Sequence, residues 1–519
     1  MSELIGQSAK PLSKELRSFC KSELLSEEGL REIIDCYGII HVGDYKFFRE
    51  ACRNERVTEG IIQCLLRYFP DAASAANENG LIPLHLACYN KNVTLNIIRF
   101  LIDAAPASVR SVTNIGRMPL HCLCQNRKLD EAAAIQILKL IIEKYAEAVR
   151  HVDNNGCLPI HIAAAAESPD FCRVLVEAYP GSERKNSAGG SLPLHLACLT
   201  GSLATVKYLF RLHSDAIIHP SNGGFYPIHA AISSCTKYRV NPATVVAIVR
   251  FLLNCDTKVK LQKWRGRSLL RYACRLAHES SNIDTALQII GAIYDAHPEA
   301  IEDNHIASKI QGYHQQVQAF INGELIYARQ AKDHRLMTTP DDNGRLPLHV
   351  VLQNNVRLGS IKLLIKGNLA AIICPDNSGA LPLHIACQHH DSTDIIDYLV
   401  ELDNSWLVHD STLDAVDRNG NTALHYACLG AKYDTITLLL EKYNAVSVSK
   451  RNDQEKLPIE ILWESNAVED RGSLKYTESV FQLLLSYPEM VTINNLALEQ
   501  SIDVDQTRNV KKRKLDHAV

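Results

Sequence analysis

Residues 193–198 read Pro193-Leu-His-Leu-Ala-Cys198, and the same six residues stand at 83–88. A near copy, Pro382-Leu-His-Ile-Ala-Cys387, occurs far downstream. The motif histidine recurs at intervals of 34 to 41 residues inside two blocks, at His85, His121, His161, His195, His229, His349, His384 and His425. A repeat that keeps this register indicates a solenoid, which extends one continuous core instead of dividing into separate compact domains.

Each copy carries the signals for a turn followed by two helices. The stretch Asp153-Asn-Asn-Gly156 is a turn sequence, because Asn and Gly adopt positive φ at little cost. The proline after the turn suits the first position of a helix, where a backbone N–H has no partner to lose. Leu84, Ala87 and Cys88 then fall on one helical face. A second, longer amphipathic segment, such as 206–210, closes the unit.

This pattern resembles that of the ankyrin-repeat family, whose signature is Thr-Pro-Leu-His-x-Ala. The resemblance covers roughly residues 40–485. It implies an all-α fold, an ankyrin-repeat solenoid of helix-turn-helix units with short finger turns, whose inner helices and fingers line a concave binding surface. The signature Thr survives only at Thr422. We therefore expect backbone groups to hold the other repeat histidines.

The array is interrupted once. A worn copy carries Arg271 in place of the motif histidine, and no motif follows until His349. We expect a helical insertion or a degenerate repeat at 301–340. The other expected segments are a flexible N-terminal segment at 1–35, an N-terminal capping repeat at 36–76, a first ankyrin block at 77–300, a second block with its C-terminal cap at 341–485, and a disordered basic tail at 486–519.

Composition excludes wholesale disorder, because 46% of the residues are hydrophobic and 22% are charged. The net charge of −3 gives no overall field for attracting nucleic acid or a membrane surface. No apolar run approaches the roughly 18 residues that span a bilayer. We expect an intracellular monomer in the cytoplasm. The tail residues Lys511, Lys512, Arg513 and Lys514 resemble a nuclear-import signal, although four basic residues near a chain end also occur without that role.

The sequence contains no nucleophile elbow, phosphate-binding loop, dinucleotide motif or His-Glu-x-x-His motif, so we expect no enzyme, no cofactor and no small-molecule substrate. Recurrent pairs such as His85 and Cys88 offer two metal ligands each. Zinc needs its ligands at about 2.0–2.3 Å, whereas stacked helices lie roughly 8–10 Å apart, so we interpret the pairs as packing residues and expect no metal. An alternative metal cluster, Cys387-Gln-His-His-Asp391, falls in an expected exposed turn.

The segment 258–275 departs from the repeat background. It gathers basic residues around an indole, with only Asp256 opposing them. Arg and Trp are the residues most typical of interaction hot spots. The candidate partner-binding residues are Lys263, Trp264, Arg265, Arg267, Arg271 and Arg275. The alternative is a solvated basic finger beside a decayed repeat.

We therefore interpret the chain as a non-catalytic scaffold or adaptor that binds one or more proteins through its concave face and fingers. The second hypothesis is a regulator that binds a polyanion or nucleic acid through 258–275, which a steep salt dependence would reveal. A third, a cryptic enzyme in 300–340, has three histidines but no partner residue at catalytic spacing.

Overall fold

A computed structural model describes residues 12–37, 45–200, 202–237, 240–277, 282–303, 306, 310–354, 356–406, 412–443, 446–465 and 473–486. The described chain is helical apart from turns and one two-stranded hairpin, which confirms the predicted all-α repeat solenoid. It divides into two compact units, Met1–His297 with Ser308–Gln318, and Pro298–Ala307 with Ala319–Val519. The division falls inside one helix, α18 (Gln315–Gln330).

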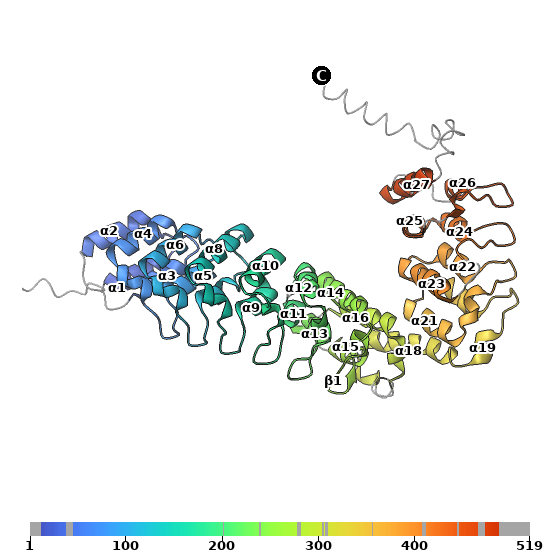
Figure 1. Ribbon diagram of the computed structural model, residues 1–519, viewed down its shortest axis with the longest axis horizontal. Coiled ribbons are helices and arrows are strands. Elements are labelled where there is room, and N and C mark those ends of the chain that lie inside the picture. Colours follow the sequence, from blue (N-terminus) through green and yellow to red (C-terminus); the bar gives the residue numbers. More distant parts are fainter. Residues whose placement is uncertain are drawn as a thin grey trace, which may run out of the picture. The chain divides into compact units, whose positions relative to one another are not determined.

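In the first unit, inner helices stack side by side in one layer and generally longer outer helices form a second layer (Figure 1). The inner helices are α1 (Leu12–Lys21), α3 (Lys46–Arg53), α5 (Pro83–Tyr89), α7 (Pro119–Leu123), α9 (Pro159–Ala166), α11 (Pro193–Thr200), α13 (Pro227–Lys237) and α15 (Leu269–Ala277). The outer helices are α2 (Glu27–Tyr37), α4 (Glu59–Tyr68), α6 (Leu95–Ala104), α8 (Glu131–Lys144), α10 (Pro169–Ala178), α12 (Leu203–Leu212), α14 (Pro242–Cys255) and α16 (Ile283–Ala296).

A short 3₁₀ helix follows most outer helices and leads the chain into a finger turn. In the first unit these are η1 (Pro70–Ser74), η2 (Pro106–Arg110), η3 (Ala146–Arg150), η4 (Ser182–Arg184), η5 (Ser214–Ile218) and η6 (Val259–Leu261), while η8 (Ile310–Gly312) instead precedes α18. Backbone hydrogen bonds join consecutive fingers: the N–H groups of Asn154 and Asn222 donate to the carbonyl oxygens of Ile115 and Gly189, each at 3.0 Å. The fingers therefore form one continuous ladder.

Helices α1 and α2 correct the expectation of a flexible segment at 1–35 for the part that the structure describes, from residue 12 onward. Leu16 on α1 and Leu30 on α2 are completely buried, and α1 packs on α3. The Asn54 amide donates to the Cys20 carbonyl at 2.9 Å, just as Asn90 donates to the Cys52 carbonyl one repeat later. The prediction followed the many charged residues, but these occupy one face of each helix and the buried stripe of Leu and Ile occupies the other.

The second unit repeats the two-layer arrangement. Its inner helices are α20 (Pro347–Leu352), α22 (Pro382–His389), α24 (Ala423–Leu429) and α26 (Pro458–Glu464), and its outer helices are α18, α21 (Leu358–Gly367), α23 (Thr393–Trp406), α25 (Tyr433–Glu441) and α27 (Leu474–Ser486). Its remaining short elements are η7 (Pro298–Glu302), α19 (His334–Thr338), η9 (Leu369–Ile373) and η10 (Val446–Ser449). The Arg357 guanidinium beside α21 lies 5.7 Å from the Phe320 ring of α18. Because α18 lies against α21 as one outer helix lies against the next, we propose that 301–340 is a degenerate repeat and not an insertion.

No helix in the described ranges is both long and apolar enough to cross a membrane. The expected basic tail, with Lys511–Lys514, lies outside the described residues.

Candidate binding surface of the basic finger

The repeat histidines join each inner helix to the next finger. His85 is completely buried: its Nδ1 accepts from the Ile82 N–H at 3.4 Å, and its Nε2 donates to the Arg117 carbonyl at 3.0 Å. Burial lowers the pKa of His85 to about 4, so the ring stays neutral near pH 7. The same two bonds recur at His121, His161, His195, His384 and His425, and the Nδ1 bond recurs at His229 and His349.

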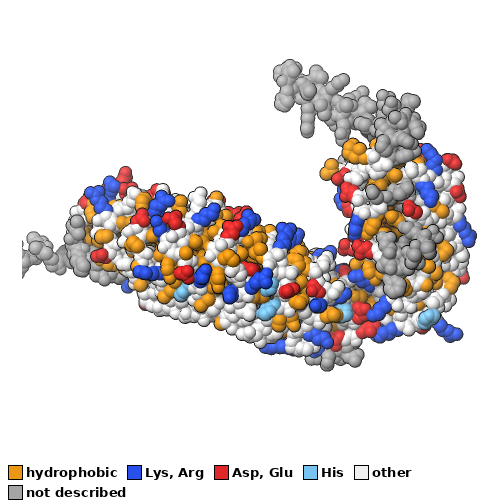
Figure 2. All heavy atoms as spheres, viewed as in Figure 1, with side chains coloured by type: hydrophobic (Ala, Val, Ile, Leu, Met, Phe, Trp, Pro, Cys, Tyr) orange, Lys and Arg blue, Asp and Glu red, His pale blue; other side chains and the backbone are white. Residues whose placement is uncertain are grey.

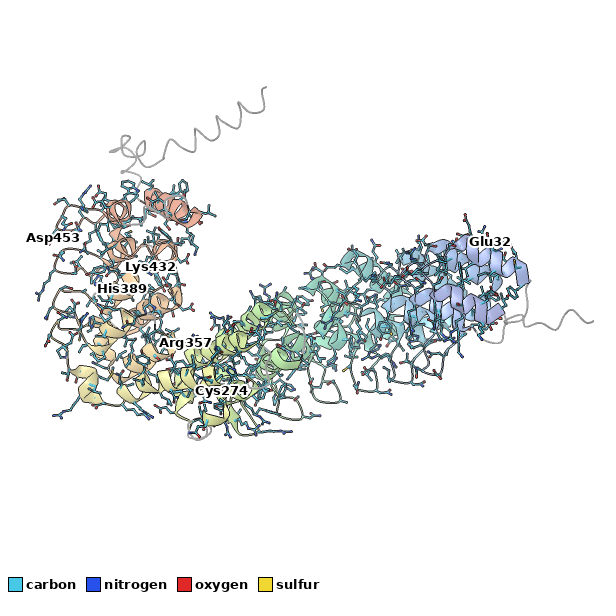
Figure 3. The ribbon with its side chains drawn as sticks, turned by 180° about the vertical axis from the view of Figure 1, so that it is seen from behind. Glu32, Cys274, Arg357, His389, Lys432 and Asp453 are labelled. Carbon is cyan, nitrogen blue, oxygen red and sulfur yellow. The ribbon has the colours of Figure 1, made fainter. Side chains whose placement is uncertain are left out.

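These bonds confirm that backbone groups hold the histidines. Where the signature residue is kept, Thr422 Oγ1 adds a hydrogen bond of 2.8 Å to His425 Nδ1. The seven repeat-position cysteines are all buried as well: Cys52, Cys88, Cys124, Cys198, Cys274, Cys387 and Cys428. Burial raises the pKa of Cys274, on α15, to about 12 (Figure 3), so this thiol behaves as an apolar filler.

The segment after Cys387 is partly the expected exposed turn, because His389 and Asp391 are exposed, but His390 departs from the expectation. His390 is completely buried, and Asp391 forms an ion pair of 2.6 Å with Lys432. Burial, and then the charge of Lys432, lower the pKa of His389 (Figure 3). Among the described residues, no group of three or more His, Cys, Asp or Glu side chains could hold a metal ion.

Arginines at the base of regular fingers are paired inside the protein. Arg117 Nε lies 3.3 Å from Asp153 Oδ2, and Arg117 Nη1 donates to Gln125 Oε1 at 2.7 Å. In the second unit Arg345 is also paired, at 2.9 Å from Asp341 of its own finger and 3.0 Å from Gln353. Such an arginine has its charge neutralised and two of its donors occupied before any partner arrives.

The finger of the worn repeat is built differently. We call residues 262–268 the basic finger. Strands β1 (Lys263–Trp264) and β2 (Arg267–Ser268) pair antiparallel around Arg265 and Gly266. Both turn residues have positive φ, 50° and 70°, which is the geometry of the tightest hairpin turns. The other described fingers contain no strand pair.

Trp264 anchors this finger rather than projecting from it. Its Nε1 donates to the Gly223 carbonyl at 3.1 Å, and so continues the ladder in place of a backbone N–H. Its ring packs edge-to-face on Phe225 and Tyr272, at 5.5 and 5.4 Å between centroids, while the Arg265 guanidinium lies 4.7 Å from its centroid. The sequence predicted Trp264 as a partner contact, but in the structure its indole mainly contacts residues of this chain.

The cations of the basic finger and α15 differ in exposure. Lys263, Arg265 and Arg275 are exposed, whereas Arg267 and Arg271 are half-buried. None of the five forms an ion pair with a carboxylate in the described part of the chain. Lys and Arg side chains colour the finger edge of the first unit in Figure 2, where Figure 1 places β1.

Three of these cations share a cavity of about 250 Å³ in the first unit. It is lined by Arg267, Arg271, Arg275, Gly312 and Tyr313. Sequence reasoning missed Gly312 and Tyr313, because they follow the worn repeat by almost forty residues and belong to no repeat motif. Lys263, Trp264 and Arg265 do not line this cavity.

A family model described as ankyrin repeats (3 copies) matches residues 49–148, 129–220, 160–241 and 305–410. The chain belongs to the ankyrin-repeat family. A second ankyrin-repeat model, described as many copies, matches residues 383–440. No curated protein matches the chain. Ankyrin repeats are protein–protein interaction domains, and proteins of this family are generally non-catalytic. The matched ranges leave out 242–304, which contains the basic finger.

Proposed function

We propose that this ankyrin-repeat protein is a non-catalytic scaffold or adaptor, and that it binds an acidic segment of a partner protein through the basic finger and helix α15. One observation carries this proposal. Arg117 and Arg345, at the base of two regular fingers, are paired with carboxylates of the same chain, whereas Arg265, Arg267, Arg271 and Arg275 have no such pair among the described residues.

The local structure favours binding by these side chains. The hairpin turn and the packed Trp264 indole fix the finger, so little backbone freedom is lost when a partner docks. Arg side chains hydrogen-bond carboxylates through two donors at once. Charge complementarity also speeds encounter and discriminates against basic partners.

Charge reversal tests the proposal. Partners are captured from a native extract with the full chain and identified by mass spectrometry. Affinity for the captured partner is then measured for wild type and for Arg265→Glu/Arg267→Glu. We expect the double reversal to weaken binding by on the order of 2 kcal/mol or more, with thermal stability nearly unchanged.

A matched control carries the same change in net charge on the outer layer. Arg99 and Lys139 are exposed on outer helices α6 and α8, so Arg99→Glu/Lys139→Glu should retain partner binding. Equal loss in both variants would mean that net charge alone governs binding. Full retention in Arg265→Glu/Arg267→Glu would show that the partner uses another surface.

The alternative function is binding of nucleic acid or another polyanion by 258–275. A polyanion binder would lose affinity steeply as salt rises, since each neutralised phosphate releases counterions. The scaffold should act in the cytoplasm as a monomer, and Lys511–Lys514 should admit it to the nucleus. A fluorescent fusion without residues 510–519 tests that import, which an unchanged distribution would disprove.

A further inference from the structure

The cavity-lining arginines stand at three positions of the repeat, and two of them, Arg271 and Arg275, replace residues of a different kind. In the repeat that starts at Arg117, the next two positions are His121 and Gln125; in the worn repeat they are Arg271 and Arg275, after Arg267. His121 Nε2 bonds the Cys157 carbonyl at 3.3 Å, and Gln125 accepts from Arg117. The worn repeat has thus replaced a buried histidine and an acceptor amide with two further cations.

This replacement leaves one hollow with three positive charges. Like charges four residues apart on a helix repel, and Arg271 and Arg275 have this spacing on α15. Among the described residues, no carboxylate lines the cavity or pairs with these guanidinium groups. An anion from outside the chain would relieve that repulsion and accept hydrogen bonds from all three side chains.

We propose that Arg267, Arg271 and Arg275 bind a phosphate monoester on a partner protein, a phosphoserine or phosphothreonine. This inference rests on the proposed function and names the chemistry recognised at the same surface. A carboxylate has two oxygens, which a single guanidinium can engage bidentately. A phosphate monoester has three terminal oxygens and a charge of about −1.5 to −2 at pH 7, so it matches three guanidinium groups better.

The dimensions of the hollow agree with this ligand. Its volume of about 250 Å³ far exceeds the roughly 10–15 Å³ that a single water needs, so a phosphate and part of its side chain can enter. The half-buried positions of Arg267 and Arg271 reduce the screening of their charges by solvent. Exposed Lys263 and Arg265 remain outside the cavity to contact the flanking peptide.

A protein segment fits better than single-stranded nucleic acid. Proteins that bind single strands stack bases on open aromatic faces. Trp264 is not a free stacking platform, because the Arg265 guanidinium lies over its ring and Phe225 and Tyr272 contact the ring edge-to-face. The net charge of −3 also supplies no extended basic track for a nucleic acid backbone.

Natural repeat residues supply the test variant. Arg271→His and Arg275→Gln install the residues that stand at these positions in the Arg117 repeat, so the double variant should fold. Its control, Arg99→Gln/Lys139→Gln, removes two cations from the outer layer. Full-length protein is incubated with immobilised peptide pools that have random flanks and a fixed central phosphoserine, serine or aspartate, and with a short DNA duplex.

We expect wild type and the control to be retained by the phosphoserine pool about tenfold or more above the serine and aspartate pools. Arg271→His/Arg275→Gln should lose this preference. Equal retention by the aspartate pool, retention only by DNA, no retention by the phosphoserine pool, or undiminished binding by the double variant would each overturn the inference.

A second measurement separates this inference from the proposed function. Partner capture is repeated from extract treated with phosphatase, and the variant Arg265→Glu/Arg267→Glu is compared with wild type. We expect phosphatase to abolish capture. Capture that survives phosphatase but is lost on charge reversal would disprove phosphate recognition while keeping the protein-binding function. Capture that survives both would disprove the proposed function itself.

Discussion

The finger that begins with Thr113 and the basic finger occupy corresponding places in one stack, yet they use their polar groups in opposite ways. In the regular repeat, Arg117 pairs with Asp153, and His121 bonds the following finger. In the worn repeat, Arg267 and Arg271 stand at these positions without a carboxylate partner among the described residues. This regular repeat therefore satisfies these polar groups internally, whereas the worn repeat leaves its cations without a carboxylate partner among the described residues.

The difference suggests that residues of the regular repeats stabilise the stack, whereas residues that depart from the repeat pattern bind the partner. A residue that recurs at one position, such as His85 or Cys88, is explained by the contacts between neighbouring repeats. A residue that departs from the pattern loses those contacts and needs another explanation. In the basic finger, the Trp264 indole N–H takes the place of the backbone N–H that joins a regular finger to the preceding one. The finger therefore keeps its position although its side chains differ from those of the regular repeats.

The largest expected difference between regular repeats and the worn repeat is the loss of stability in mild acid. Burial lowers the pKa of His85 and His195 from 6.5 to about 4. Between these values the unfolded chain binds more protons than the folded chain, so the contribution to stability is complete above pH 6.5 and is lost as the pH falls to about 4. Each histidine contributes about 3 kcal/mol, at 1.36 kcal/mol per pKa unit.

Hydrogen exchange at pH 7 and pH 5, corrected for intrinsic rates, checks this prediction. Amides of α5 and α11 should lose more protection than amides of α15, which carries Arg271 instead of histidine. Equal losses in the three helices would show that the buried histidines do not set the acid response.

An interior repeat should be more sensitive to truncation than the closing repeat. His195→Ala removes hydrogen bonds to the Leu192 N–H and the Phe225 carbonyl and leaves a cavity. We expect a loss of about 3 kcal/mol in the free energy of unfolding. Glu460→Ala removes a partly exposed cap on the Leu457 N–H, which costs about 1 kcal/mol. The two variants are compared by urea denaturation monitored by circular dichroism. Equal urea midpoints for the two variants would contradict the prediction.

Replacing the indole should have a smaller, local effect. Trp264→Phe keeps an aromatic ring beside Phe225 and Tyr272 but removes the donor to the Gly223 carbonyl. We expect a loss of about 1 kcal/mol, seen as faster amide exchange at 263–268 with the regular fingers unchanged. Unaltered exchange at 263–268 would mean that the indole bond does not hold the finger.

The repeat period predicted the regular part of the fold well, because a residue type that recurs at one repeat position makes the same contacts in each repeat. The histidines, the buried cysteines and the finger turns could all be predicted from the Pro-Leu-His motif. The helices α1 and α2 were missed because charged residues outnumber the buried Leu16 and Leu30 stripe. The sequence predicts Trp264 as a partner contact, because its bond to Gly223, some forty residues earlier, has no local signal. The cavity likewise needs Tyr313, which only the folded chain brings beside α15.

The most direct test of the difference between the two kinds of finger is the footprint of the captured partner, measured by hydrogen exchange on the full chain. We predict that the amides of 263–277 gain protection in the complex, while those of the regular finger at 113–117 change little. Protection at 113–117 with no change at 263–277 would contradict the account, because the partner would then be bound by the repeats that already satisfy their own polar groups.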